Sequence, residues 1–78
     1  MPTIHRVGGF RFFFYSNEAG EAPHVHVQRA GGLAKFWLKP VSCASSSGFR
    51  PHELTWIEQV VRAEQTRFLG AWHAYFAF

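Results

Sequence analysis

The sequence has too little cysteine for an internal disulfide, because Cys43 is the only one. A lone thiol also excludes a four-cysteine zinc site and is typical of a reducing compartment. Long apolar runs are missing as well, since none approaches the ~20 residues that a membrane-spanning helix needs. The N-terminal residues lack the apolar stretch of a secretory signal. We therefore expect a cytoplasmic protein without a membrane segment.

Acidic residues are scarce, with five Asp and Glu against eight Lys and Arg, which gives a formal charge of +3. A mildly basic chain favours a polyanionic partner such as RNA without demonstrating one. Aromatic residues, in contrast, are abundant: nine Phe, three Trp and two Tyr among 78 residues. Rings that bury ~150–250 Å² each can build the core of one small domain. The surplus predicts an interface, with Phe13 the suspected contact, and thus a homo-oligomer or a partner protein.

Alternating polar and apolar positions predict a β-hairpin in the middle of the chain. In 24–29 the sequence HVHVQR places His24 and His26 on one face and the valines on the other. LAKFWL at 33–38 follows a short glycine-containing connection and is its expected partner. Together with the strand-like segments 3–7 and 10–15, this predicts a small antiparallel sheet of about three strands within 3–39.

The rest of the chain predicts a loop and one long helix. The serine-rich residues 40–50 are typical of a flexible loop. Apolar residues then recur at steps of three and four from Leu54 onward, and Pro51 suits a first helical position. We therefore expect a single α+β domain over 1–78, in which one helix of about 51–76 covers the apolar face of the sheet.

Several motifs resemble a small bacterial domain-of-unknown-function family, namely FRFFFYSNE, PHVHV, AKFWL, GFRPHEL and AWHAYF. Members of that family are free-standing small proteins that occur beside a second small uncharacterised protein. The resemblance implies the toxin-like half of a toxin–antitoxin pair, with a small cognate partner. The succession of a histidine-bearing strand, a second strand and a helix is also similar to messenger-RNA-cleaving toxins built on a double-stranded-RNA-binding-like scaffold.

The histidine pair permits three interpretations. Residues two apart on a strand point the same way, so His24 and His26 could act as base and acid in metal-independent RNA cleavage. A His-x-His pair could instead supply two metal ligands, but zinc usually needs three or four, and His5, His52, His73 and Cys43 are remote in sequence. The pair could also be a plain polar surface. Glu18 and Glu21 precede the pair, either as anions that raise the histidine pKa values or as solubilising charges.

Our leading hypothesis is an RNA-directed ribonuclease that needs no metal and no cofactor. His24 and His26 are its predicted catalytic residues, and both are expected to project into solvent. The predicted RNA contacts are Arg29, Lys35, Trp37 and Lys39, as phosphate-binding cations and a stacking ring. Two alternatives remain: a non-catalytic module that binds a partner protein or DNA, and a histidine-based metal-binding domain.

Overall fold

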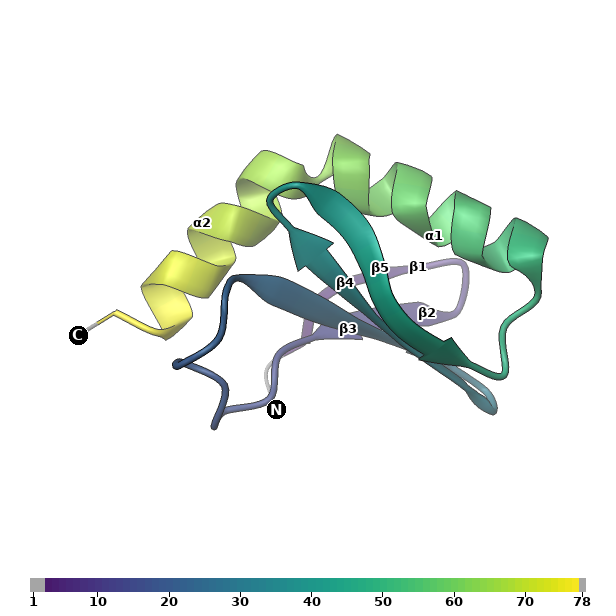
Figure 1. Cartoon of the computed structure of the whole chain (residues 1–78), viewed down its shortest axis with the longest axis horizontal. Helices are drawn as coiled ribbons and strands as arrows, with labels where there is room; N and C mark the ends of the chain where they lie inside the picture. The colour runs from purple at the N-terminus through teal and green to yellow at the C-terminus, as the bar shows by residue number, and fades with distance from the viewer. Residues whose placement is uncertain (1–2, 78) are drawn as a thin grey trace.

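The protein folds as one antiparallel sheet and two helices in a computed structural model that describes residues 3–77. The five strands are β1 (Thr3–Val7), β2 (Phe10–Phe13), β3 (His24–Arg29), β4 (Gly32–Leu38) and β5 (Val41–Ser47), and the helices are α1 (Pro51–Ala63) and α2 (Gln65–Tyr75). Each strand pairs with the next along the chain, in the order β1-β2-β3-β4-β5. Figure 1 shows α1 and α2 following one another across one face of a twisted sheet. The α+β class is therefore confirmed.

The sheet has five strands, so the expectation of about three is wrong. The largest difference is β5, which occupies most of the predicted 40–50 loop. Serine favours turns over strands, and three consecutive serines concealed this strand from pattern analysis. Almost all of β5 is exposed, so its side chains bury little apolar surface. Its backbone pairs with β4 instead, and this pairing holds an edge strand that composition alone does not predict.

The central hairpin of β3 and β4 forms as predicted, and the structure gives its register. Val25 lies opposite Phe36, and His26 lies opposite Lys35. Val25 and Phe36 face the helices and are fully buried, together with the rest of the main core. That core consists of Phe10, Phe12, Phe14, Val25, Val27, Ala34, Phe36, Leu38, Val41, Ile57, Val61, Phe68, Trp72 and Phe76. Apolar burial on this scale is the dominant favourable term in the folding of so small a domain.

The single helix expected over 51–76 is interrupted at Glu64, where φ is −102° and ψ is 11°. The interruption lies between Val61 and Phe68, where the apolar spacing lengthens to seven residues. A straight helix of that length would exceed the sheet, and the change of direction lets both side chains be fully buried. Gly70 lies inside α2 and does not interrupt it. Within residues 3–77, neither helix is long and apolar enough to span a membrane.

A second buried cluster lies on the face of the sheet opposite the helices. Phe13 is only 1 % exposed, so its prediction as an interface residue is wrong. Its ring packs against the rings of Tyr15 and His26, at centroid distances of 5.2 and 5.6 Å. The Arg11 guanidinium covers it, 4.2 Å from the ring centroid. The aromatic surplus therefore fills a second apolar layer, and this layer adjoins the histidine pair.

Candidate functional site

The two histidines lie on the same face of β3 but are not open to solvent. His24 is completely buried and His26 is 7 % exposed, so the expectation that both project into water is wrong. The ring of His24 lies between those of Trp37 and Trp72, at centroid distances of 5.6 and 4.9 Å. His26 packs against Phe13 and against the His24 ring, 5.1 Å away. Aromatic rings and a loop cover the two histidines, so the site is partly closed to solvent.

The loop that closes the site, residues 14–23, carries Glu18 to the histidines. A hydrogen bond from the Glu21 N–H to the Glu18 carbonyl, 3.1 Å, forms a turn in this loop. A second bond, from the Leu38 N–H to the Pro23 carbonyl, 3.0 Å, attaches the end of the loop to β4. The Tyr15 N–H donates to the Glu18 carboxylate, 3.3 Å. These bonds hold the carboxylate over β3.

His26 and Glu18 form a hydrogen-bonded dyad. The Nε2 atom of His26 lies 2.9 and 3.0 Å from the two carboxylate oxygens of Glu18. An ionised carboxylate only accepts hydrogen bonds, so the proton of a neutral His26 ring is on Nε2. Nδ1 then carries a lone pair. This arrangement resembles the way in which a carboxylate orients the catalytic histidine of a hydrolase.

His24 has the opposite tautomer. Its Nδ1 lies 2.9 Å from the backbone carbonyl of Ala22, and because a carbonyl oxygen only accepts, Nδ1 carries the proton. In a neutral ring, Nε2 then bears a lone pair. That atom lies 2.9 Å from a Glu18 carboxylate oxygen, but without the geometry of a hydrogen bond. Within the part of the chain that the structure describes, it is the one buried side-chain nitrogen or oxygen without a hydrogen-bond partner.

Burial and close packing shift two pKa values at the site. Burial lowers the pKa of His26 by disfavouring the imidazolium, and this effect outweighs the opposite influence of the Glu18 carboxylate. Burial acts to raise the pKa of Glu18, but its contacts with His26 and His24 outweigh it and leave that pKa below the ordinary value. Glu18 is therefore ionised at neutral pH. The Glu18 carboxylate acts to raise the pKa of His26, as expected, but burial lowers that pKa by more.

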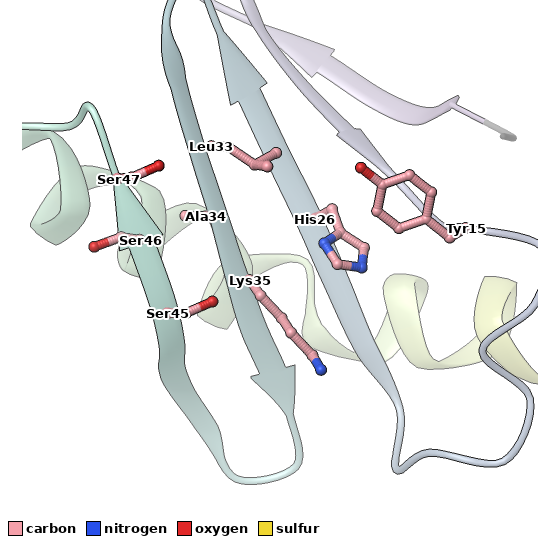
Figure 2. A pocket seen from close by; sticks show the side chains of 8 residues that line it. All are labelled: Tyr15, His26, Leu33, Ala34, Lys35, Ser45, Ser46 and Ser47. Atoms are coloured by element: carbon pink, nitrogen blue, oxygen red, sulfur yellow. The ribbon is translucent and has the colours of Figure 1, made fainter.

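A surface pocket of about 330 Å³ opens beside His26. Its lining consists of Tyr15, His26, Leu33, Ala34, Lys35, Ser45, Ser46 and Ser47. Figure 2 shows Tyr15 and Lys35 on either side of the His26 ring, one ring nitrogen of which is on the pocket side. The hydroxyls of Ser45 and Ser47 point toward β4 in this view, and that of Ser46 points away. The pocket thus combines an imidazole, an ammonium group and hydroxyls.

The predicted RNA contacts lie in three places. Lys35 and Trp37 lie on the histidine face, where the Lys35 ammonium is 4.5 Å from the Trp37 ring centroid and 2.6 Å from a Glu21 oxygen. Arg29 points to the helix side of the sheet, near Phe10 and 3.7 Å from a Glu53 oxygen. Lys39 is exposed at the turn after β4. The structure therefore brings Lys35 and Trp37 to the site, and Arg29 lies apart from it.

Glu18 is the residue that sequence analysis undervalued. Its carboxylate oxygens and the ring nitrogens of His24 and His26 provide three potential ligand atoms within 4.8 Å of one another. No other such group of three occurs in residues 3–77, so the remote candidates His5, His52, His73 and Cys43 do not join it. The spacing from Glu18 to His26 carries no recognisable motif, because the loop conformation alone determines that contact.

A protein-family model described as "Domain of unknown function (DUF4160)" matches residues 9–73. The match includes the site loop, all of β2 to β5 and α1, and most of α2. No curated protein matches the chain, and no solved structure does so either.

Proposed function

The chain belongs to the DUF4160 family, whose description assigns no activity, and from the geometry of the site we propose that it cleaves RNA in the pocket beside His26. A single observation carries this proposal. His26 is held by the Glu18 carboxylate through Nε2, while its other ring nitrogen lies on the side of a pocket that contains the Lys35 ammonium. An oriented neutral imidazole beside a fixed cation is suited to base-catalysed phosphodiester cleavage.

In the proposed reaction His26 supplies the base, and water supplies the acid. Nδ1 of His26 removes the proton of a ribose 2′-hydroxyl, and the 2′-oxygen attacks the adjacent phosphorus. The bond from phosphorus to the 5′-oxygen breaks, and that oxygen takes a proton from water in the open pocket. The hydroxide so formed takes the proton of the His26 imidazolium, which restores the neutral ring. The products are a 2′,3′-cyclic phosphate and a 5′-hydroxyl. Glu18 stabilises the His26 imidazolium that forms, as a carboxylate does in a Ser-His-Asp triad.

Two further pocket groups would bind the substrate. The Lys35 ammonium lies where it can meet the negative charge that develops on the phosphate oxygens. The Tyr15 ring, 4.4 Å from that of His26, offers a surface on which an unpaired base can stack. His24 does not line the pocket, so in this proposal it contacts Glu18 and does not serve as the acid.

Lys35→Gln is expected to weaken RNA binding at every sequence tested. A lost phosphate contact reduces the slope of log affinity against log salt by about 1. Fluorescence anisotropy with a labelled single-stranded RNA, measured at several salt concentrations, tests this expectation. Arg62→Gln removes the same charge from the exposed surface of α1 and serves as the matched control. Equal salt slopes for the two variants would rule out Lys35 as a phosphate contact.

We also propose that this activity makes the chain the toxin-like half of a two-protein module, with a small cognate partner that restrains it. The basic excess of the chain and the reactive dyad support this role, since uncontrolled RNA cleavage arrests growth. The rival role, a non-catalytic interaction module, has less support. In the part of the chain that the structure describes, the exposed large hydrophobic residues are Leu33, Trp56 and Tyr75. They belong to three different elements, β4, α1 and α2, and this distribution does not favour one shared binding surface.

A further inference from the structure

We propose that Glu18, His24 and His26 bind a divalent transition-metal ion of the zinc type. The ligands are the Nε2 atoms of the two imidazoles and the Glu18 carboxylate. The metal site itself is independent of the RNA chemistry proposed above. Its consequence for that chemistry, described below, rests on the proposed function.

The first observation is the buried, unpartnered Nε2 of His24. Its ring donates through Nδ1 to Ala22, so Nε2 of the neutral ring bears a lone pair, and a carboxylate oxygen lies only 2.9 Å from that atom. Two acceptors at that distance repel each other, and a buried polar atom without a partner is costly. A cation between them removes both costs. Imidazole nitrogen and carboxylate oxygen are ligands that zinc takes readily.

The second observation is the convergence of the three donors. With metal–ligand bonds of ~2.0–2.2 Å and a tetrahedral angle, two ligand atoms on one zinc ion are about 3.3–3.6 Å apart. The Glu18 carboxylate is 2.9 Å from Nε2 of each histidine, and no pair of donors is separated by more than 4.8 Å. Small side-chain rotations can therefore provide tetrahedral distances. Three protein ligands leave the fourth coordination position of the ion to water, as in catalytic zinc sites.

The outer contacts of the cluster match those of metal ligands. A ligating histidine usually donates its other N–H to a carbonyl or carboxylate, which fixes the tautomer and the ring orientation. The Nδ1 of His24 donates to the Ala22 carbonyl in this manner. The Tyr15 N–H likewise donates to the Glu18 carboxylate. The ring of His24 is further held between Trp37 and Trp72. The site is therefore largely arranged before an ion enters.

Metal binding would switch off the proposed RNA chemistry. An ion on Nε2 of His26 replaces the proton that this atom shares with Glu18. In the neutral metal-bound ring, Nδ1 must then carry the remaining proton, so it cannot accept one from a 2′-hydroxyl. Because the same imidazole serves in both, we infer that zinc binding and RNA cleavage exclude each other.

Calorimetric titration of the metal-free chain with ZnCl₂ tests the site. We expect one ion per chain for the wild type, and an affinity at least ~100-fold lower for His24→Gln, since a lost ligand costs more than a lost outer contact. His73→Gln alters an exposed histidine of α2 and should bind like the wild type. No binding of ZnCl₂ to the wild type, or equal affinities for all three proteins, would overturn the proposal.

CoCl₂ provides a test that needs no variant, in case His24→Gln fails to fold. Cobalt in a nitrogen–oxygen site of low coordination number gives strong visible absorption, whereas octahedral cobalt in water absorbs weakly. We expect strong absorption that saturates at one equivalent and disappears when ZnCl₂ is added. Weak absorption like that of the aqueous ion would contradict the site.

The consequence for RNA is measured separately. If the wild type cleaves RNA, one equivalent of ZnCl₂ should abolish cleavage and a chelator should restore it. Cleavage that persists with zinc bound would overturn mutual exclusion but leave the metal site in place. A chain that binds zinc and cleaves no RNA under any condition would disprove the proposed function, and the metal site would still stand on the titration.

Discussion

His26→Gln is expected to lower the rate of RNA cleavage about 10²–10⁴-fold, the usual contribution of a positioned general base. Glutamine can still donate its amide N–H to Glu18, which preserves the contact that His26 makes now. It has no basic nitrogen for the 2′-hydroxyl proton. The rate is measured from the appearance of 2′,3′-cyclic phosphate ends on a defined RNA. Growth arrest upon expression of the chain should disappear with the same change.

His73→Gln is the matched control, because it makes the same substitution at an exposed position of α2. It should leave the cleavage rate and the growth arrest unchanged. Far-ultraviolet circular dichroism of both variants verifies that each is folded. A folded His26→Gln protein that cleaves RNA at the wild-type rate would exclude His26 as the base.

Trp72→Ala is expected to reduce the free energy of unfolding by about 3–5 kcal/mol. The Trp72 side chain is 4 % exposed and packs between α2 and the site, with ring centroids 5.3 Å from Phe14, 4.9 Å from His24 and 4.2 Å from Phe76. A chain of 78 residues typically has a total stability of about 4–12 kcal/mol. This one substitution therefore removes a large share of it. Urea denaturation followed by circular dichroism measures the change.

Trp56→Ala makes the same substitution on α1, where the side chain is 37 % exposed. Trp56 still packs against Phe10 at a centroid distance of 5.0 Å, so its loss should cost about 1–2 kcal/mol. The difference between the two variants isolates the contribution of the buried position. Equal losses would mean that α2 does not pack on the sheet as described.

The hairpin of β3 and β4 was predictable because both strands alternate strictly between polar and apolar residues. A shift of one residue would expose Val25 and Phe36, so the hydrophobic pattern determines the register. In the structure Val25 pairs with Phe36 and His26 with Lys35, so the apolar residues of the two strands share one face. The helical periodicity likewise indicated most of the buried residues of α1 and α2, which are Ile57, Val61, Phe68 and Trp72. It did not predict the exposure of Tyr75 or the separation of the helices at Glu64.

The edge strand β5 could not be predicted from its composition. Its serines have no apolar alternation, and what holds the strand is backbone pairing with β4. Phe13 was misassigned for a related reason. Phe13 points to the other face of the sheet from Phe12 and Phe14, and that face was expected to be exposed. In the structure Tyr15, His26 and Arg11 cover the Phe13 ring. Side chains far apart in sequence provide that cover, so no local pattern indicates it.

The candidate site was half predicted. Strand alternation placed His24 and His26 on one face, and the structure agrees. Their burial was missed, because it depends on how the 14–23 loop folds over β3. Loops of this kind are defined by individual hydrogen bonds, such as that from the Leu38 N–H to the Pro23 carbonyl, and no periodicity encodes them. The part played by Glu18 was missed for the same reason.

The protonation of the two imidazole rings is the most direct test, since both the proposed base and the proposed ion depend on it. Nitrogen-15 NMR of the histidine side chains in the metal-free protein reads it for each ring. We predict the Nδ1–H form for His24, which donates to Ala22, and the Nε2–H form for His26, which donates to Glu18. Two rings of the same tautomer that exchange freely with solvent would mean that Glu18 holds neither histidine, and the site as described would not exist.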